Sequence, residues 1–220
     1  MYQVTSLSEF SNAAVTVIGV SVCVIDGAII SSVVPTVTIT MKRAIKKITG
    51  CDAMIIGPGI KTGLSIVIDN PAQLGSDLVV DAVAGIHEYG APIIIFDLGT
   101  ATTISVVDKN NNYIGVIMPG MGISLNAMVS GTSQLPRISL EEPKKIIGSN
   151  TVDCMKSGIL YGTASSMDGM IERIKEEIGE AKVVATGGLA STVVPHCKND
   201  IILDDELLLK GLMIIYNKNI

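Results

Sequence analysis

The chain has 220 residues, of which 48% are apolar and 17% are charged, and its formal net charge is −5. This hydrophobicity excludes an intrinsically disordered protein, and the length predicts one compact domain or two small ones packed together. The excess of acidic over basic residues disfavours a nucleic-acid-binding protein.

The most membrane-like stretch is residues 12–40, where Asp26 is the only charged residue. Asp26-Gly27 is a turn signal, Pro35 interrupts the second half, and Val, Ile and Thr favour strands. The stretch therefore predicts two buried segments joined by a turn, not a membrane span. Residues 1–10 contain no Lys or Arg, which argues against a signal peptide, so a cytoplasmic protein without a membrane partner is expected.

The cysteines and histidines show no metal-binding pattern. The four cysteines, at positions 23, 51, 154 and 197, are too far apart for a zinc knuckle or a CxxC redox pair. The two histidines, His87 and His196, have no metal-ligand spacing either. We expect the cysteines to be buried, reduced thiols.

The first part of the chain alternates between predicted strands and helices. Residues 28–34 and 53–56 are expected to be strands. Residues 38–49 have apolar side chains at helical spacing, which predicts an amphipathic helix whose basic residues 42–47 face solvent. Residues 77–87 predict a second helix.

A second block starts at Pro92, after the turn signal at Gly90, and this divides the chain into residues 1–91 and 92–220. The apolar run at 93–96 predicts a strand buried on both faces. The remaining elements expected here are strands at 102–108, 113–118 and 182–186 and helices near 124, at 151–178 and at 204–217. This order predicts an α/β fold.

The segment DLGTATT at residues 97–103 predicts a phosphate-binding hairpin. Asp97 ends an apolar strand, where a cation could lie between its carboxylate and phosphate oxygens. Gly99 lets the backbone turn tightly, while the hydroxyls of Thr100, Thr102 and Thr103 and the turn amides could face a phosphate. An ordinary hairpin turn is the alternative.

This segment resembles the second phosphate motif of the acetate and sugar kinase/Hsc70/actin superfamily, and more closely that of the type III pantothenate kinases. Other stretches resemble the same family in the same order. They are DGAIISSVVP (26–35), GPGIKTGL (57–64), DNPAQLGSD (69–77), MPGMGISLNAM (118–128), LPRISLEEPKKIIGSNT (135–151), SGILYG (157–162), MDGMIERI (167–174) and ATGGLA (185–190). The resemblance implies two ribonuclease H-like, actin-like ATPase lobes with mixed sheets and flanking helices.

The resemblance also implies a reaction. The family uses ATP with Mg²⁺ to phosphorylate the primary hydroxyl of pantothenate, the first step of coenzyme A synthesis. It requires a monovalent cation, K⁺ or NH₄⁺, and it is dimeric, so a homodimer is expected here.

Residues 75–78, Gly75-Ser76-Asp77-Leu78, stand where the family has its substrate-binding Gly-Ala-Asp-Arg. The family's Asp accepts the proton of the hydroxyl, which implies that Asp77 is the catalytic base. The residues themselves agree, because a carboxylate that follows Gly75 and opens a helix can project toward a ligand. A helix cap is the alternative for Asp77.

The other site residues are implied in the same way. Asp97 resembles the monovalent-cation ligand, Gly99 and Thr100 resemble ATP contacts, and Gly187-Gly188 resembles the adenosine-side motif. Thr151 resembles a substrate contact delivered from the partner subunit. The sequence alone leaves open that Thr151 is a helix cap and that Gly187-Gly188 is a plain turn.

Three departures from the family stand beside these matches. The family's first phosphate motif, DxGNT, is missing, so the first lobe looks truncated at its N-terminus. Leu78 replaces the family's Arg, and Ile68 replaces a common Tyr. A catalytically impaired homologue with a binding or regulatory role is therefore the alternative function, and a phosphatase or exchange factor of the superfamily is a third.

Overall fold

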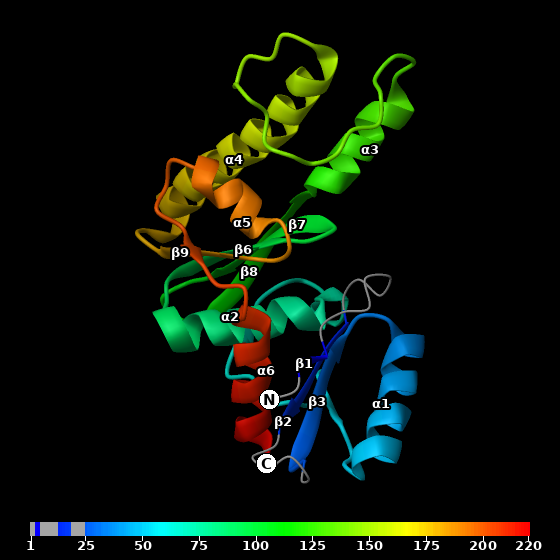
Figure 1. Cartoon of the computed structure of the whole chain (residues 1–220). Helices are drawn as coiled ribbons and strands as arrows, with labels where there is room; N and C mark the ends of the chain where they lie inside the picture. The colour runs from blue at the N-terminus through cyan, green and yellow to red at the C-terminus, as the bar shows by residue number, and fades with distance from the viewer. Residues whose placement is uncertain (1–2, 5–12, 19–24) are drawn as a thin grey trace. The chain divides into compact units, whose positions relative to one another are not determined.

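The computed structural model describes residues 3–4, 13–18 and 25–220, which form two compact units (Figure 1). The first unit is Met1–Tyr89 with Glu206–Ile220, and the second is Gly90–Asp205. Both contain a β-sheet and helices, so the predicted α/β class is confirmed.

The first unit is built from short strands and three helices. Its elements are β1 (Gln3–Val4), β2 (Ala13–Ile18), β3 (Gly27–Ser32), α1 (Pro35–Thr49), β4 (Met54–Ile55), β5 (Ser65–Ile66), the 3₁₀ turn η1 (Pro71–Gln73), α2 (Ser76–Tyr89) and α6 (Leu207–Asn219).

A four-stranded sheet in the order β1-β2-β3-β4 organises this unit. Strand β2 pairs antiparallel with β3 along its whole length, and β4 pairs with β3 in parallel. Residues 13–18 therefore pair with one edge of the predicted strand, while residues 19–24 of the same aliphatic stretch lie outside the described residues. Strand β3 ends at Ser32, because Pro35 opens α1 at a position where its missing N–H costs nothing.

Helix α1 is amphipathic, as predicted. Ile45 is buried, and the basic residues at positions 42, 43, 46 and 47 are exposed. Lys46 pairs with Asp52 at 2.6 Å, which is a solvent-exposed ion pair. The basic residues are therefore a solvated helix face.

Helix α6, at the end of the chain, packs on α2. A side chain at Gly211 would collide with the carbonyl oxygen of Val80, so the glycine allows the two helix backbones to approach closely. The buried cluster of this unit joins the two helices to β3 and to Ile56; its members are Ile29, Ile56, Val80, Val83, Leu212 and Ile215. The sequence-based division placed residues 206–220 with the second block, whereas the apolar face of their helix is buried in the first unit.

The second unit contains the longer strands and the longest helix. Its elements are β6 (Ile93–Leu98), β7 (Ala101–Val107), β8 (Asn112–Pro119), α3 (Met121–Gly131), α4 (Thr151–Ile178), β9 (Lys182–Thr186), α5 (Ala190–Val193), the 3₁₀ turn η2 (Val194–His196) and β10 (Ile202–Leu203).

The strand order within this unit is β10-β9-β6-β7-β8. Strands β6, β7 and β8 form an antiparallel meander, and β9 and β10 extend it in parallel on the side of β6. An antiparallel meander extended by parallel strands beside its first strand is the ribonuclease H-like arrangement that the resemblance implied. The bounds of α4 and β9 agree with the predicted ones, because α4 begins after a capping Asn and β9 ends at a Gly pair.

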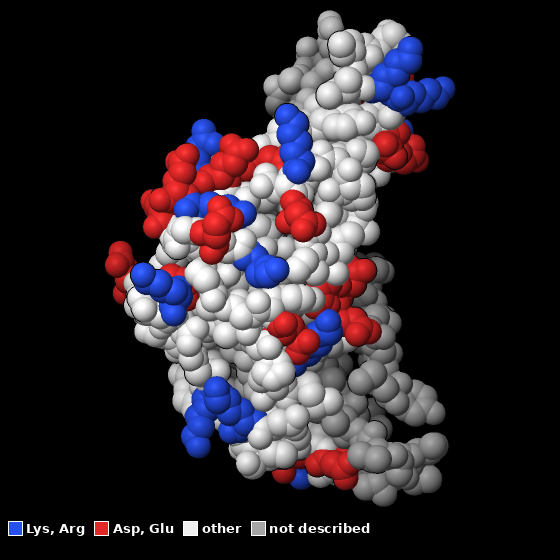
Figure 2. Space-filling model, turned by 90° about the vertical axis from the view of Figure 1, so that its left-hand side faces the viewer, with Lys and Arg blue, Asp and Glu red and all other residues white. Residues whose placement is uncertain are grey.

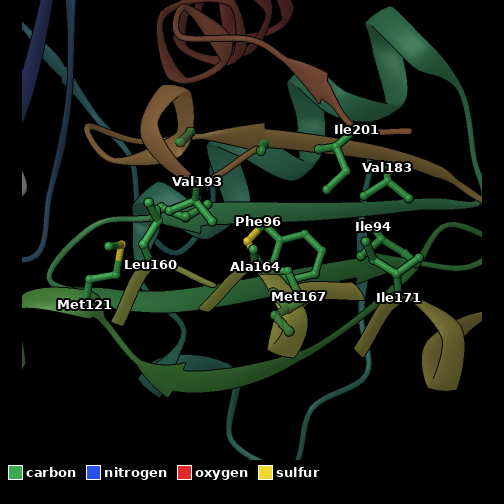
Figure 3. Close-up of a cluster of buried hydrophobic side chains, with 14 of the residues drawn as sticks. Ile94, Phe96, Met121, Leu160, Ala164, Met167, Ile171, Val183, Val193 and Ile201 are labelled. Carbon is green, nitrogen blue, oxygen red and sulfur yellow. The ribbon is translucent and has the colours of Figure 1, made fainter. Parts of the chain in front are cut away.

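The core of the second unit lies between one face of this sheet and the helices (Figure 3). Phe96 and Ile94 of β6 face Ala164, Met167 and Ile171 of α4. Because side chains alternate along a strand, Asp97 lies on the opposite face from Phe96 and Leu98. The sheet therefore has one largely apolar face and one face that carries polar groups at its end.

Asp168 of α4 anchors the loop that follows η2. Its carboxylate accepts hydrogen bonds from the backbone amides of Lys198 and Asn199 and from the Asn199 side chain, at 2.9–3.0 Å. Burial alone would raise the pKa of Asp168, but these donors outweigh it and hold that pKa below its ordinary value. The loop is thus fixed by a buried carboxylate.

Two expectations about the surface can be compared with the structure. In the part of the chain that the structure describes, no helix is both long and apolar enough to cross a bilayer. Cys154 is exposed, so the expectation of buried cysteines is wrong there, while Cys51 and Cys197 are partly buried and Cys23 lies outside the described residues. On the face shown in Figure 2, acidic and basic side chains are interspersed over a largely uncharged surface.

Candidate active site

The predicted phosphate hairpin is the turn between β6 and β7. Strand β6 ends at Leu98 and β7 begins at Ala101, so only Gly99 and Thr100 connect them. Thr100 is exposed, and Asp97 is half-buried. The turn presents a carboxylate and a hydroxyl at the end of two strands, of which β6 is otherwise apolar.

The three threonines near this turn do not share a role. Thr102 is 2% exposed and lies on the same face of β7 as Ile104, which belongs to the apolar core. Thr103 lies on the opposite face, directly across from Asp97. Strand alternation thus removes Thr102 from the set of hydroxyls that could face a phosphate, and the sequence analysis did not make this distinction.

Gly187 brings the loop after β9 to Asp97. Its φ of +92° lies in the left-handed region, and a side chain there would collide with Asp97 Oδ1 and with the backbone of Leu98. The amide of Leu189 donates to the Leu98 carbonyl at 3.3 Å, which ties the two loops together. A Cβ on Gly188 would meet no atom within 4 Å, so this position is open.

The start of α3 reaches the same turn. A side chain at Gly120 would collide with the backbone oxygen of Thr100, so only glycine allows this approach. Gly120 is also the N-cap residue of α3. The second unit therefore gathers Asp97, Gly99, Thr100 and Gly187 in one place.

The predicted base, Asp77, belongs to the first unit. Helix α2 starts at Ser76, and the Gly75 carbonyl accepts the first intrahelical bond, from Val79 at 3.4 Å, which makes Gly75 the N-cap residue. Asp77 is therefore not the cap: it lies in the first turn, where its Oδ1 accepts from the Leu78 amide at 3.1 Å and folds back toward Gly75.

The neighbours of Asp77 fix the start of the helix. The Ser76 hydroxyl is 2.8 Å from the hydroxyl of Ser31 on β3, which holds the beginning of α2 against the sheet. Leu78 and Ile68, the two departures from the family pattern, are both partly buried. Asp77 is thus held on a rigid element, with an apolar side chain directly after it.

Thr151 is the first residue of α4, but it is not the cap either. Asn150 is the N-cap residue, and its side chain accepts from the Asp153 amide at 2.9 Å, so Thr151 is exposed and its hydroxyl is not needed for capping. Leu160 of α4 lies beside Met121 (Figure 3), and Met121 directly follows Gly120, which contacts the backbone of the β6–β7 turn. At 1.5 Å per residue, Thr151 is about 14 Å farther along the helix axis. The structure does not bring Thr151 to the Asp97 turn of its own unit.

Comparison with known proteins identifies what the chain resembles. The sequence model of the type III pantothenate kinase family matches residues 2–173. A curated type III pantothenate kinase of Halalkalibacterium halodurans (strain C-125) is 45% identical over 221 residues, which cover 100% of this chain and 85% of that protein.

The chain is also similar to two solved structures. A Campylobacter jejuni protein assigned to the Baf family of transcriptional activators is 19% identical, with a TM-score of 0.53 over 82% of this chain and 78% of that one. The ethanolamine utilization protein EutJ of Carboxydothermus hydrogenoformans is 14% identical, with a TM-score of 0.48 over 93% and 85% of the two chains.

Proposed function

The chain belongs to the type III pantothenate kinase family, and we propose that it transfers a phosphoryl group from ATP to the primary hydroxyl of pantothenate. The product is 4′-phosphopantothenate, in the first step of coenzyme A synthesis. The observation that carries this proposal is the joint match to the family model and to a relative of which the chain covers 85%.

Asp77 is the proposed catalytic base. Phosphoryl transfer from ATP needs a carboxylate beside the attacking hydroxyl, to orient it and to accept its proton. Asp77 lies in the first turn of α2, where the helix N-terminus favours an anionic substrate, and its backbone is fixed by the Ser76–Ser31 contact. Gly75, Ser76 and Leu78 complete the proposed substrate-binding segment.

The phosphate end of ATP is proposed to bind at the Asp97 turn. Gly99 and Thr100 would face the phosphates, and Gly187 and Gly188 would contact the adenosine. ATP would bring Mg²⁺ with it, and Asp97 would hold a monovalent cation, K⁺ or NH₄⁺. The fit is chemical: Asp97 supplies a half-buried carboxylate, and the nearby Gly188 faces open space. A bound cation offsets the negative charge of the phosphates.

Thr151 is proposed to act in the site of a partner subunit, so the active form would be a homodimer. Its hydroxyl is exposed and is not required as a helix cap. Nearby apolar side chains are also exposed: Ile146 is 63% exposed and Ile147 is 84% exposed. Exposed aliphatic residues beside a polar contact are typical of a protein–protein interface.

We place the protein in the cytoplasm, where ATP is available, and we expect no membrane or nucleic-acid partner. The net charge of −5 and the interspersed charges of Figure 2 support the absence of a nucleic-acid partner.

A kinase assay tests the proposal. Purified protein is mixed with ATP, Mg²⁺, K⁺ and pantothenate, and ADP release is followed. We expect turnover that falls by about 10²–10⁴-fold in Asp77→Asn, because general base catalysis contributes that much. The control Glu88→Gln removes an exposed carboxylate at the other end of the same helix and should retain wild-type turnover.

Calorimetry with pantothenate separates the two functions that remain. Binding of pantothenate without turnover would favour the binding or regulatory homologue that Leu78 and Ile68 suggest. If the protein neither turns over nor binds pantothenate, that result would contradict the proposed function.

A further inference from the structure

Three polar side chains stand in one row across the sheet of the second unit. Asp97 of β6 is the register partner of Thr103 on β7 and of Thr186 on β9. Register partners on adjacent strands point to the same face, with their Cβ atoms about 4.5–5.5 Å apart in an antiparallel pair. The two threonine side chains therefore flank the Asp97 carboxylate, one on each side.

The next row into the sheet is different. There Ile95 stands between Ser105 and Val184, and all three are buried. Ser105 has a partner, because its hydroxyl is 3.0 Å from that of Tyr113. The polar row is therefore followed by a mostly apolar row, in which the Ser105 hydroxyl is already hydrogen-bonded.

Thr103 lacks such a partner. Its Oγ1 is buried and makes no hydrogen bond to any residue that the structure describes. A buried hydroxyl without a partner costs about 1–3 kcal/mol, and a bound ion is one of the few features that explain such a group. Thr186 is also buried, with 5% of its surface exposed, and it lies beside Asp97 on the other neighbouring strand.

The chemistry of the row selects the ligand. It offers oxygen atoms only, and hard cations prefer oxygen. It carries a single carboxylate, and no cluster of three His, Cys, Asp or Glu side chains occurs among residues 3–4, 13–18 and 25–220. A divalent ion held by protein groups usually has more negative ligands than this. The Asp97 carboxylate is only half-buried, so an ion can reach it from solvent.

We infer that Thr103 and Thr186 are ligands of the monovalent cation beside Asp97. Three side chains on one face of the sheet, from β6, β7 and β9, would then hold the cation. The inference rests on the proposed function for the identity of the cation. It adds two specific hydroxyl oxygens to a site for which the sequence suggested only one carboxylate. The rigid register of β7, β6 and β9 fixes their spacing before the ion binds.

Cation binding can be measured without pantothenate or turnover. The affinity for ADP is determined by calorimetry at increasing K⁺ in the wild type and in Thr103→Val and Thr186→Val. These substitutions keep the β-branched shape and remove the hydroxyl. We expect the K⁺ concentration at which ADP affinity is half-maximally increased to rise at least tenfold in each.

Matched variants make the result specific. Thr103→Ser and Thr186→Ser keep the hydroxyl oxygen and should have K⁺ midpoints close to that of the wild type. Thr102→Val removes a neighbouring hydroxyl on the opposite face and should titrate like the wild type. Wild-type K⁺ midpoints in both valine variants would overturn the inference.

A second result would also overturn it: weaker ADP binding at saturating K⁺ with an unchanged K⁺ midpoint, since the hydroxyls would then contact phosphate. The proposed function fails separately. K⁺-dependent ADP binding without phosphorylation of pantothenate would contradict the kinase proposal and leave the cation site standing. An active kinase whose ADP binding is independent of K⁺ would support the kinase proposal and contradict the cation site.

Discussion

The side chain of Asn219 makes two hydrogen bonds to the backbone of Lys61, which lies 158 residues earlier in the chain. Its Oδ1 accepts from the Lys61 amide at 2.9 Å, and its Nδ2 donates to the Lys61 carbonyl at 3.0 Å. The adjacent Lys218 ammonium donates to the Thr62 carbonyl at 3.0 Å. The end of α6 therefore holds the glycine-rich loop at residues 57–63, which the sequence analysis did not connect to it.

Removing this clamp should loosen the loop. In Asn219→Ala, the Lys61 amide loses its acceptor, and a hydrogen bond of this kind is worth about 0.5–1.5 kcal/mol. We expect hydrogen exchange at Lys61 to accelerate up to about tenfold, measured by NMR, since 1.4 kcal/mol is a tenfold change. Asn219→Asp keeps the acceptor oxygen and should exchange more slowly than the alanine variant. Equal exchange in Asn219→Ala and in the control Asn217→Ala, at an exposed position of the same helix, would argue against the clamp.

The two adjacent glycines after β9 should respond differently to alanine. Gly187→Ala places a Cβ against Asp97 and Leu98 at a positive φ, and such strain costs about 1–3 kcal/mol. We expect a lower unfolding midpoint and at least tenfold weaker ATP binding. Gly188→Ala meets open space, so its stability should stay within about 0.5 kcal/mol of the wild type. Similar unfolding midpoints for the two variants would show that the Asp97 contact is not tight.

Leu78→Arg tests whether the departure from the family weakens substrate binding. An Arg beside Asp77 offers a fork of donors that suits the carboxylate of pantothenate. A charge-assisted hydrogen bond is worth about 1.5–3 kcal/mol, so we expect pantothenate to bind about ten- to a hundredfold more tightly. The control Leu78→Gln has polar length without charge and should change the affinity little. If calorimetry gives the same affinity for both variants and the wild type, position 78 does not contact the substrate.

Asp168→Asn should destabilise the second unit in a pH-dependent way. The amide keeps one acceptor oxygen but turns a donor toward the amides of Lys198 and Asn199, which we expect to cost about 1–3 kcal/mol at neutral pH. Because the folded pKa of Asp168 is lowered, its contribution is complete above the unfolded value of 3.8 and is lost as pH falls below it.

Urea unfolding at pH 7 and at pH 3 measures this difference. The gap between Asp168→Asn and the wild type should shrink at pH 3. The exposed control Asp200→Asn should show little effect at either pH. A gap that stays constant between the two pH values would mean that the ionised carboxylate is not what stabilises the loop.

Cysteine modification should discriminate between Cys154 and Cys197. Burial raises the pKa of Cys197 to about 11, with a smaller contribution from the negative charge of Asp168, so only about one thiol in a thousand is ionised at pH 8. Cys154 is exposed at the start of α4. Iodoacetamide at pH 8, followed by mass spectrometry, should label Cys154 at least tenfold faster. Comparable rates would mean that the region around Cys197 opens readily.

Local patterns predicted the second unit well. The apolar run at 93–96 and the long periodic segment after Asn150 are each decided by neighbours in the sequence, so the strand and the helix were found. The turn between β6 and β7 was found in the same way, because an Asp and a Gly end an apolar strand there. Strand periodicity alone could also have separated Thr102 from Thr103.

Long-range contacts were not accessible to such reasoning. Nothing near Leu207 indicates that its helix packs on α2, because an amphipathic helix can bury its apolar face against any partner. The alignment of Thr186 with Asp97 depends on the parallel pairing of β9 with β6, which is a property of the sheet and not of either segment. The bond from Asn219 to Lys61 is of the same kind.

The discontinuity of the first unit affects how the protein is made. Helix α6 follows the whole second unit, so the ribosome delivers residues 1–89 on the order of ten seconds before the helix that packs on α2, at about 5–20 residues per second. During that interval Val80 and Val83 lack the apolar partners Leu212 and Ile215 and are exposed to chaperones and to other nascent chains. The second unit, by contrast, is contiguous and has all of its own strands before synthesis reaches α6. The first unit, whose synthesis begins first, is therefore the last to be completed.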